Sequence, residues 1–184
     1  IGHNLKLTVY GESHGKSIGA VLDGLPSGEY LDWDEVKKEM ARRAPGKNTL
    51  STSRKEGDAF DVQSGYFNNA TTGTPLAVMI ENTNTRSEDY DDLRHLMRPG
   101  HADYTGKVRY DGYNDYRGGG HFSGRLTAPL VFAGAVASQI LARRGIHVGS
   151  HILQIHDVQD RPFNPIHEEL SRLLSLKNMT LPLL

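Results

Sequence analysis

Short stretches of alternating or continuously apolar residues along the chain predict β-strands. The stretch Leu5–Tyr10 alternates, and Ile18–Leu22 is a short apolar stretch closed by the turn residues Asp23–Gly28. Because these two strands follow each other directly, we expect antiparallel pairing early in the chain. Three further strands are expected over Phe60–Phe67, Leu76–Glu81 and Ile146–Ile155.

Apolar residues at helical spacing indicate three helices. Asp32 can cap the first, with Glu35 three residues on as a capping-box variant, and this helix ends before Pro45-Gly46. A long apolar helix is predicted over Leu126–Arg144 and a shorter one over Ile166–Leu176. Helices interspersed irregularly among strands favour an α+β fold with antiparallel sheets over a βαβ repeat.

The length of the chain permits one domain with a buried core. It has 184 residues and a mass of 20.3 kDa. We therefore expect residues 1–184 to form a single domain. The chain begins at Ile1 without a methionine and ends on the apolar pair Leu183-Leu184, so we expect it to be part of a longer protein.

Composition excludes several classes of protein. Hydrophobic residues make up 37% and charged residues 23%, which is unlike a disordered chain. A net charge of −1 and a pI of about 6.8 disfavour a nucleic-acid binder that relies on bulk charge. No apolar run in the sequence approaches the roughly 18 residues of a membrane span. Cysteine is absent from the sequence, and no carboxylate stands at ligand spacing beside His147, His151 and His156, so no metal site is expected.

The segment from Gly11 to Ser17 follows the first strand and nearly matches a phosphate-binding P-loop. A P-loop has four residues between its first glycine and Gly-Lys-Ser, whereas this chain has three. The next apolar stretch is short, so the long helix of a P-loop is not expected. Ser13 and His14 also suggest a hydrolase nucleophile and base, but neighbours on an extended chain face opposite sides. A plain polar turn is the alternative.

The stretch from Arg42 to Lys55 is basic and contains no acidic residue. Its arginine side chains can bind a phosphate or carboxylate through two parallel N–H bonds. A solvated surface is the alternative explanation. Because Pro45-Gly46 breaks the helix within the stretch, we expect the chain to fold back so that its basic groups converge.

Two further segments carry candidate chemistry. His101 ends the segment Met97–His101, which we expect to be an ordered turn, and the carboxylate of nearby Asp103 can orient its imidazole. The glycine-rich segment Gly118–Arg125 opens the long helix, where N–H groups and the helix dipole favour an anion. It is not the dinucleotide-binding fingerprint, because Ser123 stands where that pattern needs glycine.

Taken together, these segments resemble chorismate synthase over nearly the whole chain. Several separate motifs in the family's order are hard to obtain by chance. The family's chains are considerably longer, so the resemblance implies that this chain is their N-terminal portion. The matching motifs are Gly11–Gly15, Asp23–Pro26, Arg42–Gly46, Ser64-Gly65, Thr72–Pro75, Glu81–Thr83, Asp89-Tyr90, Arg98–Thr105 and Asp115–Gly120.

The resemblance implies an activity. Chorismate synthase converts 5-enolpyruvylshikimate 3-phosphate to chorismate by trans-1,4-elimination of phosphate and a ring proton, and it needs reduced FMN without net redox change. The resemblance further implies that His14 assists the departing phosphate and that His101 acts on the reduced flavin, roles that suit groups titrating near neutral pH. It implies a substrate site formed by Ser13, Arg42, Arg43, Arg54 and Arg125.

The family's flavin-binding segment falls on His121, Phe122, Ser123, Gly124 and Arg125. The commonest family pattern there is Arg-Ser-Ser-Ala-Arg, so this chain keeps only the serine and the last arginine. Thr49, likewise, stands where many members have another arginine. We therefore expect the side chains at positions 121 and 122 to contact FMN in a different way.

The family fold is an α+β sandwich in which antiparallel sheets enclose long helices, with an internal duplication. The resemblance implies that this chain supplies about half of that fold, in a cytoplasmic homotetramer without nucleic-acid or membrane partners. Two alternatives stay open. One is a phosphate- or nucleotide-binding module without catalysis, and the other is a folded but inactive truncated fragment.

Overall fold

The computed structural model describes residues 2–44, 57–83, 96–162, 164, 169–177 and 179. Contacts divide the chain into two compact units, Ile1–Gln139 and Ile140–Leu184, and each is treated separately below. The expectation of a single domain over 1–184 stays a prediction.

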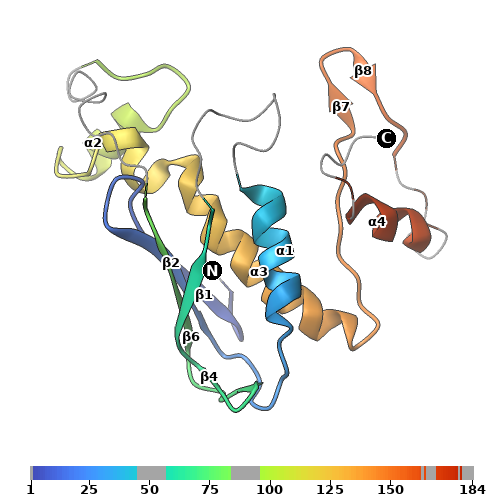
Figure 1. Ribbon diagram of the computed structural model, residues 1–184. Helices are drawn as coiled ribbons and strands as arrows, with labels where there is room; N and C mark the ends of the chain where they lie inside the picture. The colour runs from blue at the N-terminus through green and yellow to red at the C-terminus, as the bar shows by residue number, and fades with distance from the viewer. Residues whose placement is uncertain are drawn as a thin grey trace. The chain divides into compact units, whose positions relative to one another are not determined.

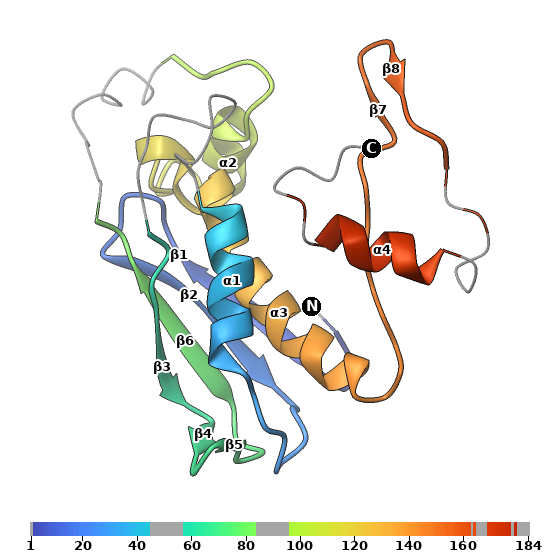
Figure 2. The same ribbon diagram turned by 45° about the vertical axis from the view of Figure 1, so that its right-hand side comes forward.

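The first unit, drawn in Figure 1, is built on a four-stranded antiparallel sheet. Its strand order, β1-β2-β6-β3, can be followed in Figure 2. Its central pair, β2 and β6, places Ile18 opposite Ile80 and Leu22 opposite Leu76. This register puts alternate apolar residues of both strands on one buried face, namely Ile18, Ala20 and Leu22 of β2 and Leu76, Val78 and Ile80 of β6. The four strands are β1 (Lys6–Gly11), β2 (Ser17–Asp23), β3 (Phe60–Ser64) and β6 (Leu76–Glu81).

These bounds confirm the strands expected in the first half of the chain, with one difference. The strand expected over Phe60–Phe67 is interrupted at Gly65, whose φ of 83° is left-handed. The chain turns there and continues as β4 (Tyr66–Phe67), which pairs with β5 (Ala70–Thr71) in a separate two-stranded ribbon.

Two helices, α1 (Trp33–Arg43) and α3 (Thr127–Ala142), run along one face of the sheet (Figure 2). Phe132 of α3 is fully buried and joins these layers. Its ring stacks on Trp33 of α1 at a centroid distance of 6.3 Å and meets Phe60 of β3 edge-on at 5.0 Å. The core therefore lies between the sheet and these two helices, and the expected α+β class is confirmed.

The N-terminus of α1 is capped as the sequence indicates, but only in part. The Asp32 carboxylate accepts hydrogen bonds from the N–H groups of Asp34 and Glu35. The reciprocal bond of a capping box is made by a different residue, because the Asp32 N–H donates to Gln139 Oε1 at 2.8 Å. This long-range bond fixes the start of α1 to α3.

The stretch Arg117–Ala142 is long and apolar enough, by length and composition, to cross a membrane. Half of its 18-residue apolar window is buried inside the protein, and the backbone of Gly118–Gly120 at its start is not helical. The helix α3 itself has 16 residues, fewer than the roughly 20 that a span requires. Its apolar character is accounted for by packing inside the first unit.

The second unit contains the end of α3, a short hairpin and a helix. The hairpin is formed by β7 (Gln154–Ile155) and β8 (Val158–Gln159), and the helix is α4 (Leu170–Lys177). The long strand expected over Ile146–Ile155 is wrong, because only its last two residues find a pairing partner within the described part of the chain. His151, next to the hairpin, has its Nδ1 2.9 Å from Asp160 Oδ2. The described residues contain no group of three or more metal-ligating side chains.

Gly134 offers a direct test of how α3 is packed in this chain. It lies in the interior of α3, and a Cβ added to it would meet no atom within 4 Å. We expect Gly134→Ala to raise the free energy of unfolding by about 0.5–1 kcal/mol, since alanine loses less backbone entropy in a helix. Urea unfolding followed by circular dichroism measures this; a loss of stability would show that the position is covered by another surface.

Candidate functional site

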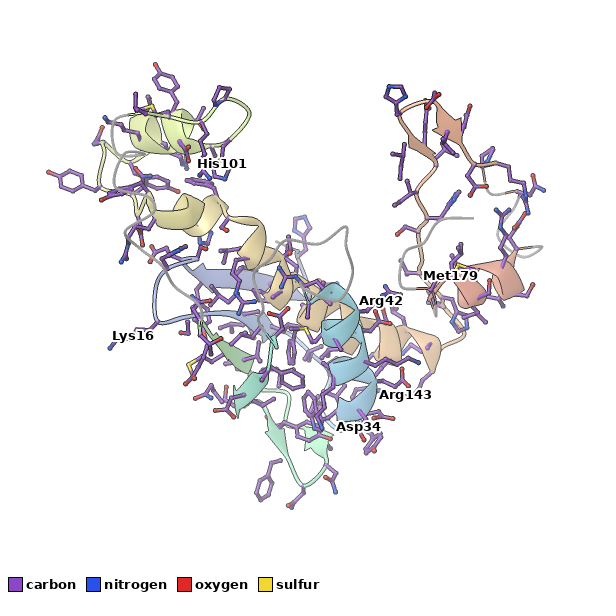
Figure 3. The ribbon with its side chains drawn as sticks, turned by 45° about the horizontal axis from the view of Figure 1, so that its top comes forward. Lys16, Asp34, Arg42, His101, Arg143 and Met179 are labelled. Carbon is purple, nitrogen blue, oxygen red and sulfur yellow. The ribbon has the colours of Figure 1, made fainter. Side chains whose placement is uncertain are left out.

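The segment expected to resemble a P-loop forms a tight turn between β1 and β2. The Gly15 N–H donates to Glu12 O at 3.0 Å, and β2 begins at Ser17 without any intervening helix. Lys16 is exposed and extends away from the sheet (Figure 3). The structure therefore confirms that this is not a P-loop, in which the lysine would face the phosphates.

Ser13 and His14, at the tip of this turn, are both buried. A Cβ placed on Gly118 would lie 2.3 Å from His14 Cε1 and 3.0 Å from Ser13 Oγ, so both side chains contact the same glycine. The expectation that they face opposite sides was wrong. It assumed extended backbone, whereas the turn brings the two neighbouring side chains onto one surface.

The glycine loop Gly118–Gly120 contacts both candidate histidines. Its three residues have φ angles of 58°, 88° and 54°, a left-handed run that side chains disfavour. The ring of His14 lies against Gly118, and a Cβ on Gly119 would lie 2.5 Å from His101 Cε1. Two histidines from distant motifs therefore converge on adjacent residues that have no side chains.

His101 is held by the turn expected from the sequence. Its N–H donates to Arg98 O at 3.4 Å, and its Nδ1 lies 2.8 Å from Asp103 Oδ1, at the start of α2 (Asp103–Arg109). Arg98 donates from Nε and from its terminal nitrogen to the two carboxylate oxygens, each at 2.8 Å. These hydrogen bonds lower the pKa of the Asp103 carboxyl well below its usual value. The predicted orientation of His101 by Asp103 is confirmed.

The lowered pKa of Asp103 gives a pH-dependent prediction. The folded carboxylate is favoured over the unfolded one, so its contribution is full above the ordinary pKa of 3.8 and is lost as the pH falls further. We expect Asp103→Asn to lower the free energy of unfolding by about 1–2 kcal/mol near neutral pH. Urea titrations of both proteins across the acid range should show the difference shrinking at low pH; a constant difference would contradict the ionic origin.

A second ion pair supports the glycine loop, and sequence reasoning missed it. Arg117 donates to both oxygens of Asp115, from Nε at 2.9 Å and from its terminal nitrogen at 2.8 Å. These hydrogen bonds lower the pKa of Asp115 and raise the pKa of Arg117. The nearby His14 makes a smaller contribution to the lowered pKa of Asp115. Opposite charges two residues apart, directly before three glycines, were the available signal.

Arg43 and Arg125, both expected to bind substrate, meet at a buried carboxylate. Arg43, at the end of α1, donates to Asp58 Oδ2 at 2.6 Å, and Arg125 donates to the other oxygen of the same group. The side chains of Arg125 and Asp58 are 3% and 0% exposed, so this is an interior ion pair. Asp58 was missed because nothing in its local sequence marks it.

Arg42, also expected to bind substrate, makes a different contact. Arg42 is on the last turn of α1, 41% exposed, with its guanidinium 3.1 Å from Glu39 on the same helix (Figure 3). Arg54 and Thr49 lie outside the described residues, as does the Pro45-Gly46 break.

The expected flavin segment follows the glycine loop directly. His121 Nδ1 lies 2.9 Å from Gly11 O, which ties the segment to the end of β1. The Phe122 ring is 38% exposed and packs over Gly106 of α2, near Tyr110. Ser123 caps the next short turn by accepting the Arg125 N–H, and a Cβ on Gly124 would meet open space.

Comparison with known proteins assigns this arrangement to a family. Residues 5–179 match the family model of chorismate synthase. The chain belongs to the chorismate synthase family. It is 44% identical over 181 residues to the chorismate synthase of Thermococcus kodakarensis, covering 98% of this chain and 49% of that protein. It is 48% identical over 158 residues to that of Porphyromonas gingivalis, covering 86% and 43%.

A solved crystal structure of chorismate synthase supports the same assignment. It matches with a TM-score of 0.70 and 28% sequence identity, over 98% of this chain and 49% of the other. The chain thus spans about half the length of the chorismate synthases that it matches. The resemblance inferred from the motifs and the α+β class are both confirmed.

Proposed function

We propose that this chain supplies the His14–His101 site of a chorismate synthase, a lyase of the shikimate pathway. The reaction is the trans-1,4-elimination of phosphate and a ring proton from 5-enolpyruvylshikimate 3-phosphate. The observation that carries the proposal is the convergence of His14 and His101 on Gly118 and Gly119. Two titratable side chains in one site match a reaction in which a phosphate and a proton both depart.

We assign the two histidines different roles. Ser13 and His14 sit at one end of the glycine loop, where His14 would donate a proton to the departing phosphate and Ser13 would hydrogen-bond the substrate. The Nδ1 of His101 is engaged by Asp103, so its Nε2 is the atom that would exchange a proton with the flavin. The contact with Asp103 holds the imidazole ring in place, which suits a group that exchanges a proton at one defined nitrogen.

The segment after the glycine loop is chemically suited to FMN. Phe122 offers a partly exposed aromatic face for a flat ring system, and Ser123 and Gly124 offer a hydroxyl and uncrowded backbone. His121 adds a polar edge beside Gly11. Reduced FMN, when bound, would supply transient electron density to the substrate without net redox change.

The arginines divide into two kinds in this proposal. Arg42 and Arg54 would bind the phosphate or carboxylates of the substrate directly. Arg43 is half-buried and shares the Asp58 carboxylate with Arg125. Because one carboxylate faces two guanidinium groups, the charge of Arg43 is only partly neutralised and can still attract a substrate anion. Arg125, with its guanidinium buried, would act on substrate and flavin by fixing the loop from which Ser123 and Gly124 project. The whole enzyme would be a cytoplasmic homotetramer.

The decisive experiment is anaerobic turnover with chemically reduced FMN and 5-enolpyruvylshikimate 3-phosphate, on this chain and on any longer form of the protein. Chorismate formation that needs reduced flavin supports the proposal. Flavin-independent binding of nucleotides without turnover in either form would favour the binding-module alternative. Turnover confined to a longer form would assign the inactive-fragment alternative to this chain alone.

A further inference from the structure

Asn82 connects the histidine-bearing turn to the interior of the first unit. It follows β6 directly and makes three hydrogen bonds to the Glu12–Lys16 turn. Its backbone N–H donates to Lys16 O at 3.1 Å, and its side-chain Nδ2 donates to Glu12 O and to Gly15 O, both at 2.9 Å. The two side-chain bonds therefore clamp the backbone on either side of Ser13 and His14.

The chemistry of its neighbours fixes which way the amide faces. Arg125 Nε lies 3.1 Å from Asn82 Oδ1, and a guanidinium nitrogen can only donate. The opposite end of the amide faces two backbone carbonyls, which can only accept. Only one orientation satisfies all three contacts, and a carboxylate of the same shape cannot replace it.

The clamp is anchored in the buried ion pair. Arg125, which accepts no bond and donates to Asn82 Oδ1, also donates to Glu81 O at 3.2 Å and to the Asp58 carboxylate. Asp58 is buried and has a φ of 48°, an uncommon conformation for a residue other than glycine. A continuous series of contacts thus runs from Asp58 through Arg125 and Asn82 to the turn that carries His14.

We propose that Asn82 is a positioning residue that holds His14 in the geometry needed for proton transfer. This inference rests on the proposed function for its effect on turnover, but not for its effect on His14 itself. Ser13, between the clamped carbonyls, donates its N–H to Gly120 O at 3.1 Å, so a shift of the turn also changes how His14 meets the glycine loop. A misplacement of about 1 Å can cost about 10²-fold in rate.

The test is Asn82→Asp, which keeps the size of the side chain and an acceptor for Arg125 Nε. It replaces the donor that faces the Glu12 and Gly15 carbonyls by an acceptor. We expect the His14 imidazole resonance, assigned by its loss in His14→Ala, to shift and broaden in the NMR spectrum. In the form of the protein that turns over, we expect kcat to fall about 10²-fold with KM changed less than about threefold.

Two further variants make the result decisive. Gln63→Glu makes the same amide-to-acid change at an exposed position of β3 and should leave the His14 resonance and kcat unchanged. Asn82→Ser is uncharged and too short to reach both carbonyls, so it replaces Asn82→Asp if the latter fails to fold, and should give the same shift. An unchanged His14 resonance in a folded Asn82 variant overturns the inference. If the wild-type protein shows no turnover, that result contradicts the proposed function only. The His14 resonance still tests whether Asn82 positions His14.

Discussion

Replacing His14 or His101 by glutamine is expected to slow turnover about 10²–10⁴-fold, the usual cost of removing a general acid or base. Glutamine keeps hydrogen-bonding capacity and much of the volume but cannot titrate near neutral pH. Both rings lie against glycines, so no side chain of the glycine loop has to move when a ring is replaced, and the packing of the site is little changed. Anaerobic single-turnover measurements with reduced FMN separate this loss from slower substrate binding.

The pH dependence separates the two residues further. If each histidine moves a proton, each single variant should remove a different limb of the pH profile of kcat. The double variant should lose much less than the product of the two single effects, since groups that act in one reaction are not additive.

His156→Gln provides the matched control for both variants. The His156 side chain is 88% exposed and pairs only with neighbouring Asp157 at 2.7 Å among the contacts of the described residues. Its replacement should leave turnover and its pH profile unchanged. Wild-type turnover in folded His14→Gln and His101→Gln would show that the convergence on the glycine loop is structural and that the catalytic assignment is wrong.

The sequence predicts most of the first unit because its signals there are local. Short apolar stretches place β2 and β6, and their register follows once one face must be buried. The strand expected over Ile146–Ile155 is wrong because a local signal does not show whether a pairing partner is present. An apolar stretch becomes a strand only where it has one. Gln154 and Ile155 find one in β8.

The candidate site is only partly predictable, because its supporting contacts are long-range. The motifs locate His14, His101 and the glycines, and the local pair of His101 with Asp103 is anticipated from their spacing. Asp58 lies in no motif, and the motif Glu81–Thr83 marks Asn82 without indicating what it contacts. Both residues contact Arg125, which is 67 residues from Asp58 and 43 residues from Asn82 in the chain. No pattern within a window of the sequence contains that information.

Gly118→Ala is expected to have the second large effect, through geometry rather than chemistry. The added Cβ would lie 2.3 Å from Cε1 and 2.4 Å from Nδ1 of His14, closer than unbonded atoms approach. The ring must move, and the φ of 58° adds about 1–2 kcal/mol of backbone strain. We expect turnover to fall about 10²-fold or more, together with a loss of stability.

Gly28→Ala separates strain from collision. Gly28 also has a left-handed φ, of 81°, but a Cβ there would meet no atom within 4 Å. It should lose stability by about 1–2 kcal/mol while turnover stays unchanged. The urea midpoint and the anaerobic turnover rate are measured for both variants. Gly118→Ala should differ from Gly28→Ala mainly in its lower turnover rate. If the two variants have the same urea midpoint and the same turnover rate, His14 tolerates a side chain at position 118. The contact between the His14 ring and the glycine loop then does not set the catalytic position of His14.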